Sequence, residues 1–265
     1  MKDSTALALR RLSHVYVSDK GASLAVEGIE LAVAPGEFVS LVGPSGCGKT
    51  TLLSLLAGLF PPTSGEVWLG GEKVSGPSPK VGYMLQQDYL FPWRTIRDNA
   101  AVGLEIQGTK SADTMKKVEG WLEELGLGGA GSRYPHELSG GMRQRVALAR
   151  TLVTEPEVLL LDEPFSALDL HIKMQLEAIV VETLRKLGKT AVLVTHDLSE
   201  AAAMSDRVVV LGRNPGHIRK IIAIPEPIRA ADPIAARKLP GFQELFEALW
   251  SELDAVDGKG GESHA

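Results

Sequence analysis

The chain has 265 residues, of which 44% are hydrophobic, so it can bury a sizeable core as one large domain or as a domain with a subdomain. Its formal net charge is −5 and the sequence lacks a block of Lys and Arg, which argues against a nucleic-acid-binding protein. Residues 1–12 lack the apolar core of a secretion signal and no apolar run is long enough to span a bilayer, so we expect any work at a membrane to need a partner.

The first part of the chain, residues 7–33, is predicted to form β-structure. Ile29, Leu31 and Val33 alternate with smaller or more polar residues, which is typical of a half-buried strand. Tyr16 lies in this region, and an aromatic ring ahead of a nucleotide site can stack on a base. From the residue pattern alone, however, simple packing is the favoured role for Tyr16.

A glycine-rich stretch between a predicted strand at 38–42 and a predicted helix at 51–57 matches the phosphate-binding pattern G-x-x-x-x-G-K-[ST]. This context favours a nucleoside triphosphate site over a glycine-rich turn without a ligand. Glycines let backbone N–H groups approach phosphate oxygens, and the helix start adds the positive end of its dipole. Lys49 would pair with the β- and γ-phosphates, and the Thr50 hydroxyl would ligate Mg²⁺. The expected nucleotide-binding residues here are Gly43, Pro44, Ser45, Gly46, Cys47, Gly48, Lys49, Thr50 and Thr51.

Cys47 is the only cysteine, so the chain cannot form an internal disulfide, and we expect a cytosolic protein. A position at a helix N-terminus can lower the pKa of a thiol. We nevertheless expect no catalytic role, because Cys47 occupies a variable slot of the phosphate-binding pattern.

Two short strands, 66–69 and 81–85, are predicted after the first helix. The second leads into Gln86 and then into Phe91-Pro92-Trp93, a group of apolar residues in a loop. The chain then takes on helical periodicity, and we expect a helical subdomain at about residues 90–152.

A second candidate anion site lies near the end of this helical part. Ser139 is a suitable N-cap, and Gly140 and Gly141 would expose backbone N–H groups at the start of a helix. An ordinary capped helix explains the same residues equally well, so the residues by themselves leave both interpretations open.

Two buried strands are predicted to end in polar residues. The apolar run 158–161 suits a central parallel strand and ends in Asp162 and Glu163, and the strand predicted at 190–195 ends in His196. Carboxyl ends of parallel strands meet at the edge where open α/β sheets bind ligands, which favours a site over solvated carboxylates and a structural histidine. We expect Asp162 to help hold Mg²⁺, Glu163 to act as a base for the attacking water, and His196 to contact a γ-phosphate.

The tail follows a predicted helix at 173–187 and a predicted strand at 208–211. The prolines between residues 225 and 233 predict an extended connector. Apolar residues at helical spacing from Phe242 to Leu253 predict a short amphipathic helix that packs on the domain or on a partner. The last residues, 258–265, are predicted to be disordered.

The order of these motifs resembles that of the ATP-binding subunit of an ABC transporter, over about residues 7–224. The resemblance implies an α/β fold of the P-loop NTPase class: a RecA-like core with an N-terminal antiparallel β subdomain and an inserted helical subdomain. It divides the chain into an ABC ATPase domain, 1–225, and a C-terminal extension, 226–265. Met142 stands where the family most often has Gln, so no contact of that side chain is carried over. The matching motifs are the Walker A loop Gly43–Thr50, the Q-loop Gln86, the signature Leu138–Met142, the Walker B pair Asp162 and Glu163, the D-loop Ser166–Asp169 and the H-loop His196.

The resemblance also implies a head-to-tail dimer, with each ATP between the phosphate loop of one chain and Ser139, Gly140 and Gly141 of the other. One phosphate group held by two chains would account for both candidate anion sites. The implied catalytic residues are Glu163, His196, Lys49 and Gln86. The other implied roles are adenine stacking for Tyr16, Mg²⁺ binding, directly or through water, for Thr50, Gln86 and Asp162, and a link between the two sites for Asp169.

The implied partners are two integral-membrane permease subunits, docked near Gln86 and Phe91-Pro92-Trp93, with the ATPase peripheral on the cytoplasmic face of the inner membrane and without nucleic acid. Segment 90–93 and the proline-rich tail resemble importers of small anions of the nitrate, sulfonate, taurine or bicarbonate type. Such importers also use an extracytoplasmic solute-binding protein.

Other functions for the same motifs are an importer or exporter of a different substrate and a soluble ABC ATPase. A chromosome-maintenance ATPase would need a long heptad insertion, and a translation factor would need a second cassette and a basic linker, neither of which the sequence contains. A non-enzymatic nucleotide-binding module would most simply lack Glu163 or His196, and both are present.

Overall fold

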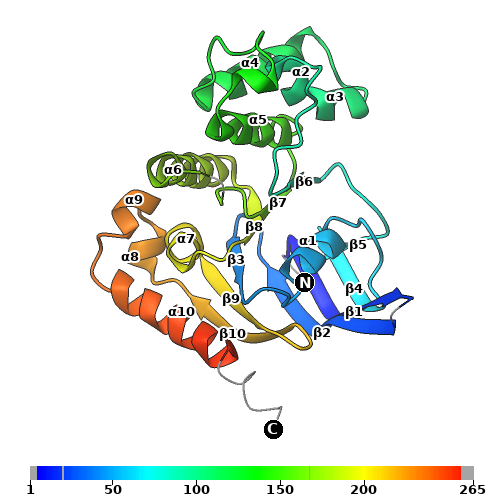
Figure 1. Ribbon diagram of the computed structural model, residues 1–265, viewed down its shortest axis with the longest axis vertical. Coiled ribbons are helices and arrows are strands. Elements are labelled where there is room, and N and C mark those ends of the chain that lie inside the picture. Colours follow the sequence, from blue (N-terminus) through cyan, green and yellow to red (C-terminus); the bar gives the residue numbers. More distant parts are fainter. Residues whose placement is uncertain (1–4, 20, 167, 258–265) are drawn as a thin grey trace.

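The computed structural model describes residues 5–19, 21–166 and 168–257, in which two β-sheets and their helices enclose hydrophobic cores (Figure 1). The architecture is α/β, as expected. Ala167 of the expected D-loop and the segment 258–265, predicted to be disordered, lie outside the described residues.

A six-stranded sheet with strand order β10-β9-β3-β8-β7-β6 forms the centre of the molecule. Its strands are β3 Phe38–Val42, β6 Val81–Met84, β7 Val158–Asp162, β8 Thr190–Val194, β9 Arg207–Gly212 and β10 His217–Ala223. Five strands run parallel, and β10, which the sequence did not predict, pairs antiparallel with β9. The sheet is covered on both faces: in β7, Leu159 and Leu161 join one hydrophobic cluster, whereas Val158 and Leu160 join another.

A four-stranded antiparallel sheet, with order β2-β1-β4-β5, lies beside the first. Its strands are β1 Leu7–Ser18, β2 Gly21–Val33, β4 Ser64–Leu69 and β5 Glu72–Lys73. The helix α1, Lys49–Leu56, precedes β4, so two of the four strands of this sheet, β4 and β5, follow the phosphate loop in the chain. The four buried leucines of α1 share one cluster with residues of both sheets, which fixes the start of the helix relative to both.

A helical layer, at the top of Figure 1, connects β6 to β7. It consists of α2 Ile96–Ala100, α3 Val102–Ile106, α4 Ala112–Glu124, the short 3-10 helix η1 Pro135–Glu137 and α5 Gly140–Leu152. Side-chain N-caps start three of these helices: Thr95 for α2, Ser111 for α4 and, as predicted, Ser139 for α5. Apolar residues of the layer share a cluster with Met84 and Leu161 of the central sheet.

The C-terminal helices cover the other end of the central sheet, beside β9 and β10 (Figure 1). They are α7 Leu198–Met204, α8 Glu226–Arg229, α9 Pro233–Ala236 and α10 Phe242–Asp257. The helix α6 Leu170–Leu187 shares a cluster with the helical layer and contacts α7 and α9. The prediction of an extended connector at 225–233 is wrong, since α8 and the start of α9 form there. These helices form because Ile228 and Ala236 are buried and Asp232 caps α9. The apolar stripe of α10 packs against α7 and β9.

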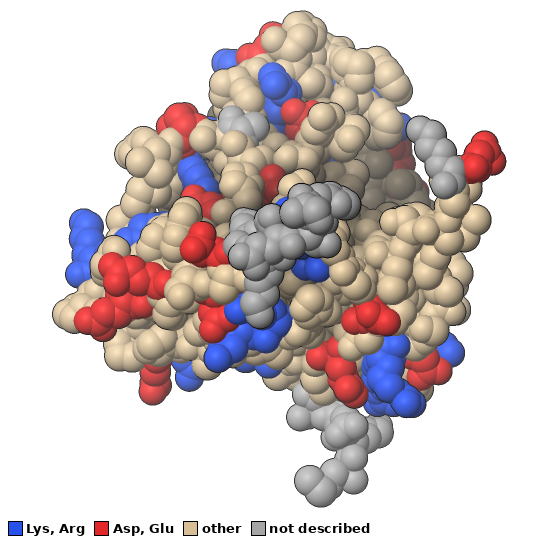
Figure 2. Space-filling view, turned by 60° about the horizontal axis from the view of Figure 1, so that its bottom comes forward, with Lys and Arg blue, Asp and Glu red and all other residues tan. Residues whose placement is uncertain are grey.

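Charges of both signs are mixed on the surface. Figure 2 shows Lys and Arg side chains interspersed with Asp and Glu over one face of the molecule, and most of that face belongs to other residues. Among the described helices, none is both long and apolar enough to cross a membrane.

Candidate nucleotide site

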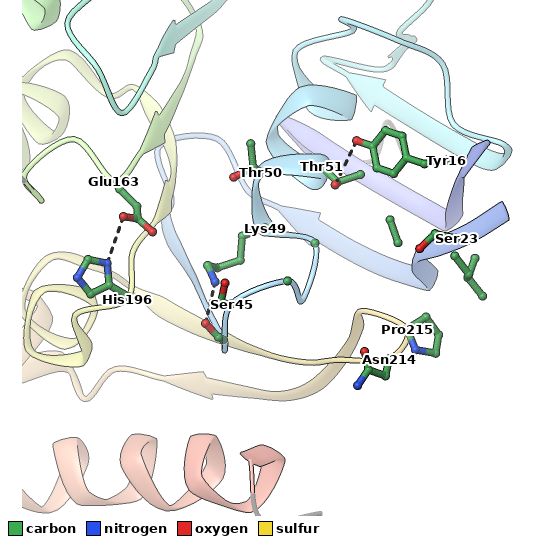
Figure 3. A pocket seen from close by; sticks show the side chains of 15 residues that line it. Tyr16, Ser23, Ser45, Lys49, Thr50, Thr51, Glu163, His196, Asn214 and Pro215 are labelled. Atoms are coloured by element: carbon green, nitrogen blue, oxygen red, sulfur yellow. Dashed lines mark hydrogen bonds and ion pairs between the residues drawn. The ribbon is translucent and has the colours of Figure 1, made fainter. Parts of the chain in front are cut away.

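A cavity of about 600 Å³ opens where the phosphate loop, the carboxyl ends of β7 and β8, the β1–β2 hairpin and the β9–β10 turn meet (Figure 3). The predicted site residues that line it are Tyr16, Gly43, Ser45, Gly46, Gly48, Lys49, Thr50, Thr51, Glu163 and His196. The sequence did not predict five further lining residues, which are Ser23, Leu24, Ala25, Asn214 and Pro215. Ser23 pairs with Tyr16 across the hairpin, so its place followed from the register of β1 and β2.

The phosphate loop needs glycine where it joins α1. Gly48 has a φ of 91°, and a Cβ there would lie 2.3 Å from Val26 Cγ1 and 3.2 Å from the carbonyl oxygen of Ala25. The loop therefore sits directly on β2. Lys49 Nζ donates a hydrogen bond of 2.7 Å to the carbonyl of Gly43, which places the ammonium over the same loop (Figure 3). The loop backbone and one positive charge thus line a single cavity, as an anion site requires.

Cys47 is fully buried beneath the loop. A Cβ at Gly43 would come within 2.6 Å of its Sγ, so the thiol packs closely against the loop backbone. Burial raises the pKa of the Cys47 thiol, although Lys49 acts in the opposite direction. The lowered pKa that a helix N-terminus can cause is therefore not found, and the thiol serves as a packing group.

Tyr16 forms the wall opposite the strand ends. The residue is 45% exposed, so it combines the packing favoured by the residue pattern, on His14 and Phe60, with a free surface toward the cavity. The ring is held edge-on by His14, at 4.7 Å between centroids, and its hydroxyl lies 3.3 Å from Thr51 Oγ1 (Figure 3). An exposed and well-oriented aromatic ring at the rim of a cavity can stack on a flat ligand.

Asp162 lies at the end of β7 and is largely buried. Burial and the neighbouring charge of Glu163 raise the pKa of the Asp162 carboxyl, while a hydrogen bond from the Thr50 hydroxyl lowers it. The Tyr83 hydroxyl donates to Asp162 Oδ2 at 3.4 Å. Burial and Asp162 raise the pKa of Tyr83 to about 12, so this phenol keeps its proton. The sequence did not predict Tyr83, because its partner lies on the adjacent strand.

Glu163 is held in an unusual backbone conformation. Its φ is 45°, and its N–H donates to the carbonyl of Val194 at 2.9 Å, across to the end of β8. Its Oε2 lies 3.2 Å from His196 Nδ1 (Figure 3). The same oxygen accepts a 3.1 Å hydrogen bond from Gln86 Nε2. Three predicted site residues from separate segments therefore meet at one carboxylate, and backbone strain of this kind is common at functional sites.

The family model described as ABC transporter matches residues 26–166, more than half of the chain. The chain belongs to the ABC transporter family. An uncharacterized ABC transporter ATP-binding protein, YtlC of Bacillus subtilis (strain 168), is 48% identical over 95% of this chain and 96% of its own length. The aliphatic sulfonates import ATP-binding protein SsuB of the same organism is 41% identical over 91% of this chain and 92% of its own.

A solved structure agrees with this assignment. The dimeric, post-hydrolysis state of the ATP-binding cassette MJ0796, bound to ADP and Pi, superimposes with a TM-score of 0.75 at 30% identity, covering 83% of this chain and 99% of that one. The P-loop NTPase fold expected from the sequence is thereby confirmed, and the chain is an ATPase of the ABC type.

The signature residues of this ABC ATPase lie apart from the cavity. Ser139, Gly140 and Gly141 are at the start of α5 in the helical layer, Asp169 caps α6, and none of the four lines the cavity. Ser139 and Gly140 are exposed. The side chain of Met142 packs toward the core of the helical layer, away from a ligand role. In one chain, therefore, the phosphate loop and the signature do not share a ligand site.

The Q-loop of the ABC ATPase is nevertheless tied to the signature helix. Gln144 Nε2, on α5, donates to the carbonyl of Gln86 at 2.9 Å, and Arg143 Nε pairs with Asp88 Oδ2 at 2.9 Å. Gln144 is almost fully buried, and a polar residue on the buried face of α5 was the feature in the sequence that could have revealed this link. A movement of α5 would thus shift Gln86 and, through Gln86, the side chain of Glu163.

The oxygen donors of the site fit Mg²⁺ bound together with phosphates. Among the residues the structure describes, no group of three or more His, Cys, Asp or Glu side chains forms a metal site. Mg²⁺ commonly takes one or two protein oxygens and completes its shell with phosphate oxygens and water. The Thr50 hydroxyl and the Asp162 carboxylate, already hydrogen-bonded, supply such oxygens. Gln86 uses its amide nitrogen on Glu163, which leaves its carbonyl oxygen as a further donor.

Proposed function

We propose that the chain is the ATP-hydrolysing subunit of an importer of small sulfonates and that it works as a head-to-tail dimer. One observation carries the dimer: the cavity contains the phosphate loop, Glu163 and His196 but lacks the signature residues 139–141, which are at the start of a different helix. Each cavity is then half of a site, completed by the α5 N-terminus of a second chain. The similarity to a cassette whose structure is dimeric supports the same arrangement.

The residues of the cavity divide the work of ATP hydrolysis. Tyr16 stacks on the adenine, and the phosphate-loop amides with Lys49 bind the β- and γ-phosphates. Glu163 orients the attacking water and accepts its proton. His196, whose Nδ1 lies beside Glu163 Oε2, approaches the γ-phosphate from the end of β8. The α5 N-terminus of the second chain adds N–H donors to the γ-phosphate, so hydrolysis-competent geometry arises only in the closed dimer.

Mg²⁺ would be held by Thr50 and Asp162, with Gln86 directly or through water, and would supply charge neutralisation on the phosphate oxygens. Because Gln86 also touches Glu163, the same side chain senses the metal site and orients the base. Asp169, at the start of α6, lies outside the cavity of its own chain and is proposed to reach the second site of the dimer.

The proposals for the membrane partners and the substrate are based on the similarity to the relatives. The similarity to a subunit of aliphatic sulfonate import favours small sulfonates, the chemical class that includes taurine, over nitrate and bicarbonate. We place the dimer on the cytoplasmic face of the membrane, under two permease subunits that contact Trp93, while a separate solute-binding protein delivers the substrate. The ATPase does not itself contact the sulfonate.

Mixing two inactive variants tests the shared site. Lys49→Ala removes the charge of the phosphate loop, and Ser139→Arg blocks the signature. Each homodimer therefore has no competent site. A mixed head-to-tail dimer keeps one intact site, and random 1:1 mixing should restore at most about a quarter of the wild-type ATPase rate. Mixing wild type with the Lys49→Ala/Ser139→Arg double variant serves as the control. That mixed dimer has no intact site, so only the wild-type homodimers contribute, and the rate should be about a quarter of the wild-type rate rather than the half expected if each chain worked alone. If the two single variants stay inactive together, the shared site is wrong.

Substrate class is tested by uptake. Cells lacking this gene should lose accumulation of radiolabelled taurine and ethanesulfonate and regain it with the wild-type gene but not with Glu163→Gln. If the cells instead lost accumulation of nitrate or bicarbonate, that anion would be the assigned substrate.

A further inference from the structure

A cluster of charged side chains lies buried between α6 and α7, outside the nucleotide cavity. We call it the α6–α7 cluster; its members are Lys173, Glu177, Asp197, Glu200 and Arg237. Lys173 Nζ lies 2.7 Å from Asp197 Oδ2 and 2.7 Å from Glu200 Oε2, and both Glu177 and Glu200 are almost fully buried. Glu177 and Glu200 are buried and the other three are partly buried, which is costly, and none of the five lines the proposed ATP site.

Arg237 enters the cluster from the C-terminal extension, directly after α9. Its NH2 donates to Glu177 Oε2 on α6 at 2.6 Å, and its Nε donates to Ser199 Oγ on α7 at 3.1 Å. Its NH1 donates to the carbonyl of Pro233, which fixes the guanidinium within its own segment. One side chain of the extension therefore links α6 to α7, and α6, α7 and α9 pack together (Figure 1).

The two linked helices begin at motifs of the ATPase. Asp169, in the D-loop, caps α6, and Asp197, next to His196, caps α7 by accepting from the N–H groups of Ser199 and Glu200. Asp197 N–H in turn donates to Thr195 Oγ1 at 3.0 Å. A shift of α7 relative to α6 would therefore move the backbone that carries His196.

The cluster has more acidic than basic members, so each of its cations matters for pairing the buried carboxyl groups. It contains three carboxylates and two cations, and Glu177 Oε1 and Glu200 Oε1 have no hydrogen-bond partner among the described residues. Without Arg237, Glu177 would keep a buried charge with no direct partner, and the link that Arg237 makes from Glu177 on α6 to Ser199 on α7 would be lost.

We propose that Arg237 is a positioning residue for His196: the C-terminal extension fixes α7 against α6 and thereby sets the rate of ATP hydrolysis. This inference rests on the proposed role of His196 at the γ-phosphate. Arg237 contacts neither the cavity nor its lining residues, so it acts through helix position alone.

Kinetics of the purified full chain test this role. Arg237→Met should lower kcat about tenfold while the Kd for ATP, measured by calorimetry with Glu163→Gln in the background, stays within about twofold. Arg237→Lys, which keeps the charge but loses the fork that reaches both helices, should recover part of kcat. The double variant Glu177→Gln/Arg237→Met has no unpaired buried charge at position 177. It should therefore recover the melting temperature but not kcat.

The matched control removes a different ion pair between the extension and the core. Arg219 Nε, on β10, lies 3.1 Å from Glu252 Oε2 on α10, and neither residue belongs to α6 or α7. Arg219→Met should leave kcat unchanged. If Arg219→Met lowers kcat as much as Arg237→Met, or if the double variant recovers kcat together with the melting temperature, the effect is one of general stability and the positioning role is wrong.

His196→Ala, measured beside these variants, separates the two levels of inference. A wild-type rate in His196→Ala would remove the proposed role of His196 and this inference with it. A low rate in His196→Ala with a wild-type rate in Arg237→Met would overturn the positioning role alone.

Discussion

Gln86 Nε2 donates a 3.1 Å hydrogen bond to Glu163 Oε2, so the segment that leads into the helical layer directly holds the proposed base. The backbone carbonyl of the same glutamine accepts from Gln144 on α5. A chain of two hydrogen bonds therefore runs from the signature helix to the carboxylate. The position of the helical layer and the orientation of the base are consequently coupled in a single chain, before any partner binds.

The first prediction concerns Glu163 itself. Glu163→Gln is nearly isosteric and keeps an acceptor for Gln86, but it cannot accept a proton from water. We expect kcat to fall by at least about 100-fold while ATP binding remains. Light scattering should show the variant as an ATP-dependent dimer, because a bound and unhydrolysed nucleotide keeps the shared site closed. Near-normal ATPase activity would exclude Glu163 as the base.

The second prediction separates stacking from hydrogen bonding at Tyr16. Tyr16→Ala removes the ring and should raise the Kd for ATP about tenfold, since stacking of one base is worth about 1–3 kcal/mol. Tyr16→Phe loses only the 3.3 Å contact between the hydroxyl and Thr51 and should bind ATP nearly as well as the wild type. Calorimetric titration with ATP measures both, and equal losses in the two variants would argue against stacking.

The third prediction concerns the junction of the phosphate loop and α1. Gly48→Ala would force a Cβ into Val26 at a φ that alanine rarely adopts, so ATP binding should weaken at least about tenfold. Gly71, in the β4–β5 turn, has a similar φ of 83° but open space around it. Gly71→Ala therefore carries the backbone strain without the clash and should leave ATP binding unchanged. Equal binding by both variants would show that the loop can move off β2.

Features fixed by neighbouring residues could be predicted from the sequence. The phosphate loop, the strand ending in Asp162 and the cap Ser139 were all predicted at their observed places, because each depends on a few adjacent residues. The helical layer, too, shows in the spacing of its apolar residues. Such local patterns were enough to gather the P-loop, Glu163 and His196 at one edge of a sheet.

Features that depend on distant contacts could not be predicted. Strand β10 is mostly exposed, with only Ile218 and Ile222 partly buried, and exists because it pairs with β9. The connector at 225–233 reads as extended from its prolines, yet Ile228 finds a buried place beside α7 and the segment becomes helical. Pro215 reaches the cavity because Gly216 pairs with Val26 of β2, a contact that no local sequence pattern indicates.

The fourth prediction concerns docking to the membrane partner. Trp93 is 72% exposed, and its loop is held rigid by Asn99, whose Oδ1 accepts from the N–H of Phe91 at 2.7 Å. A rigid and exposed tryptophan is a typical anchor of a protein interface. Trp93→Ala should leave the ATPase rate of the isolated subunit unchanged and lower transport by the reconstituted importer about fivefold or more. Unchanged transport would place the docking surface elsewhere.

The fifth prediction follows from the charge balance of the α6–α7 cluster. Burial raises the pKa of Glu200 from 4.5 to about 7, and the charges of Glu177 and Asp197 act in the same direction against Lys173. Between these two pH values the folded chain keeps a proton on Glu200 that the unfolded chain has released. The contribution of Glu200 to stability is therefore greatest below about pH 4.5 and declines as the pH rises toward 7, by about 3 kcal/mol.

Glu200→Gln tests this directly, because glutamine carries no charge at any pH. Urea unfolding of both proteins at pH 5, 6, 7 and 8 should give similar free energies of unfolding at the lowest pH. As the pH rises, the free energy of unfolding of the variant should increasingly exceed that of the wild type, by about 3 kcal/mol at pH 8. Lys173 keeps its ion pair with Asp197 in the variant, so α7 remains attached to α6. A difference between the two proteins that stays constant from pH 5 to 8 would show that Glu200 titrates alike in the folded and unfolded chains.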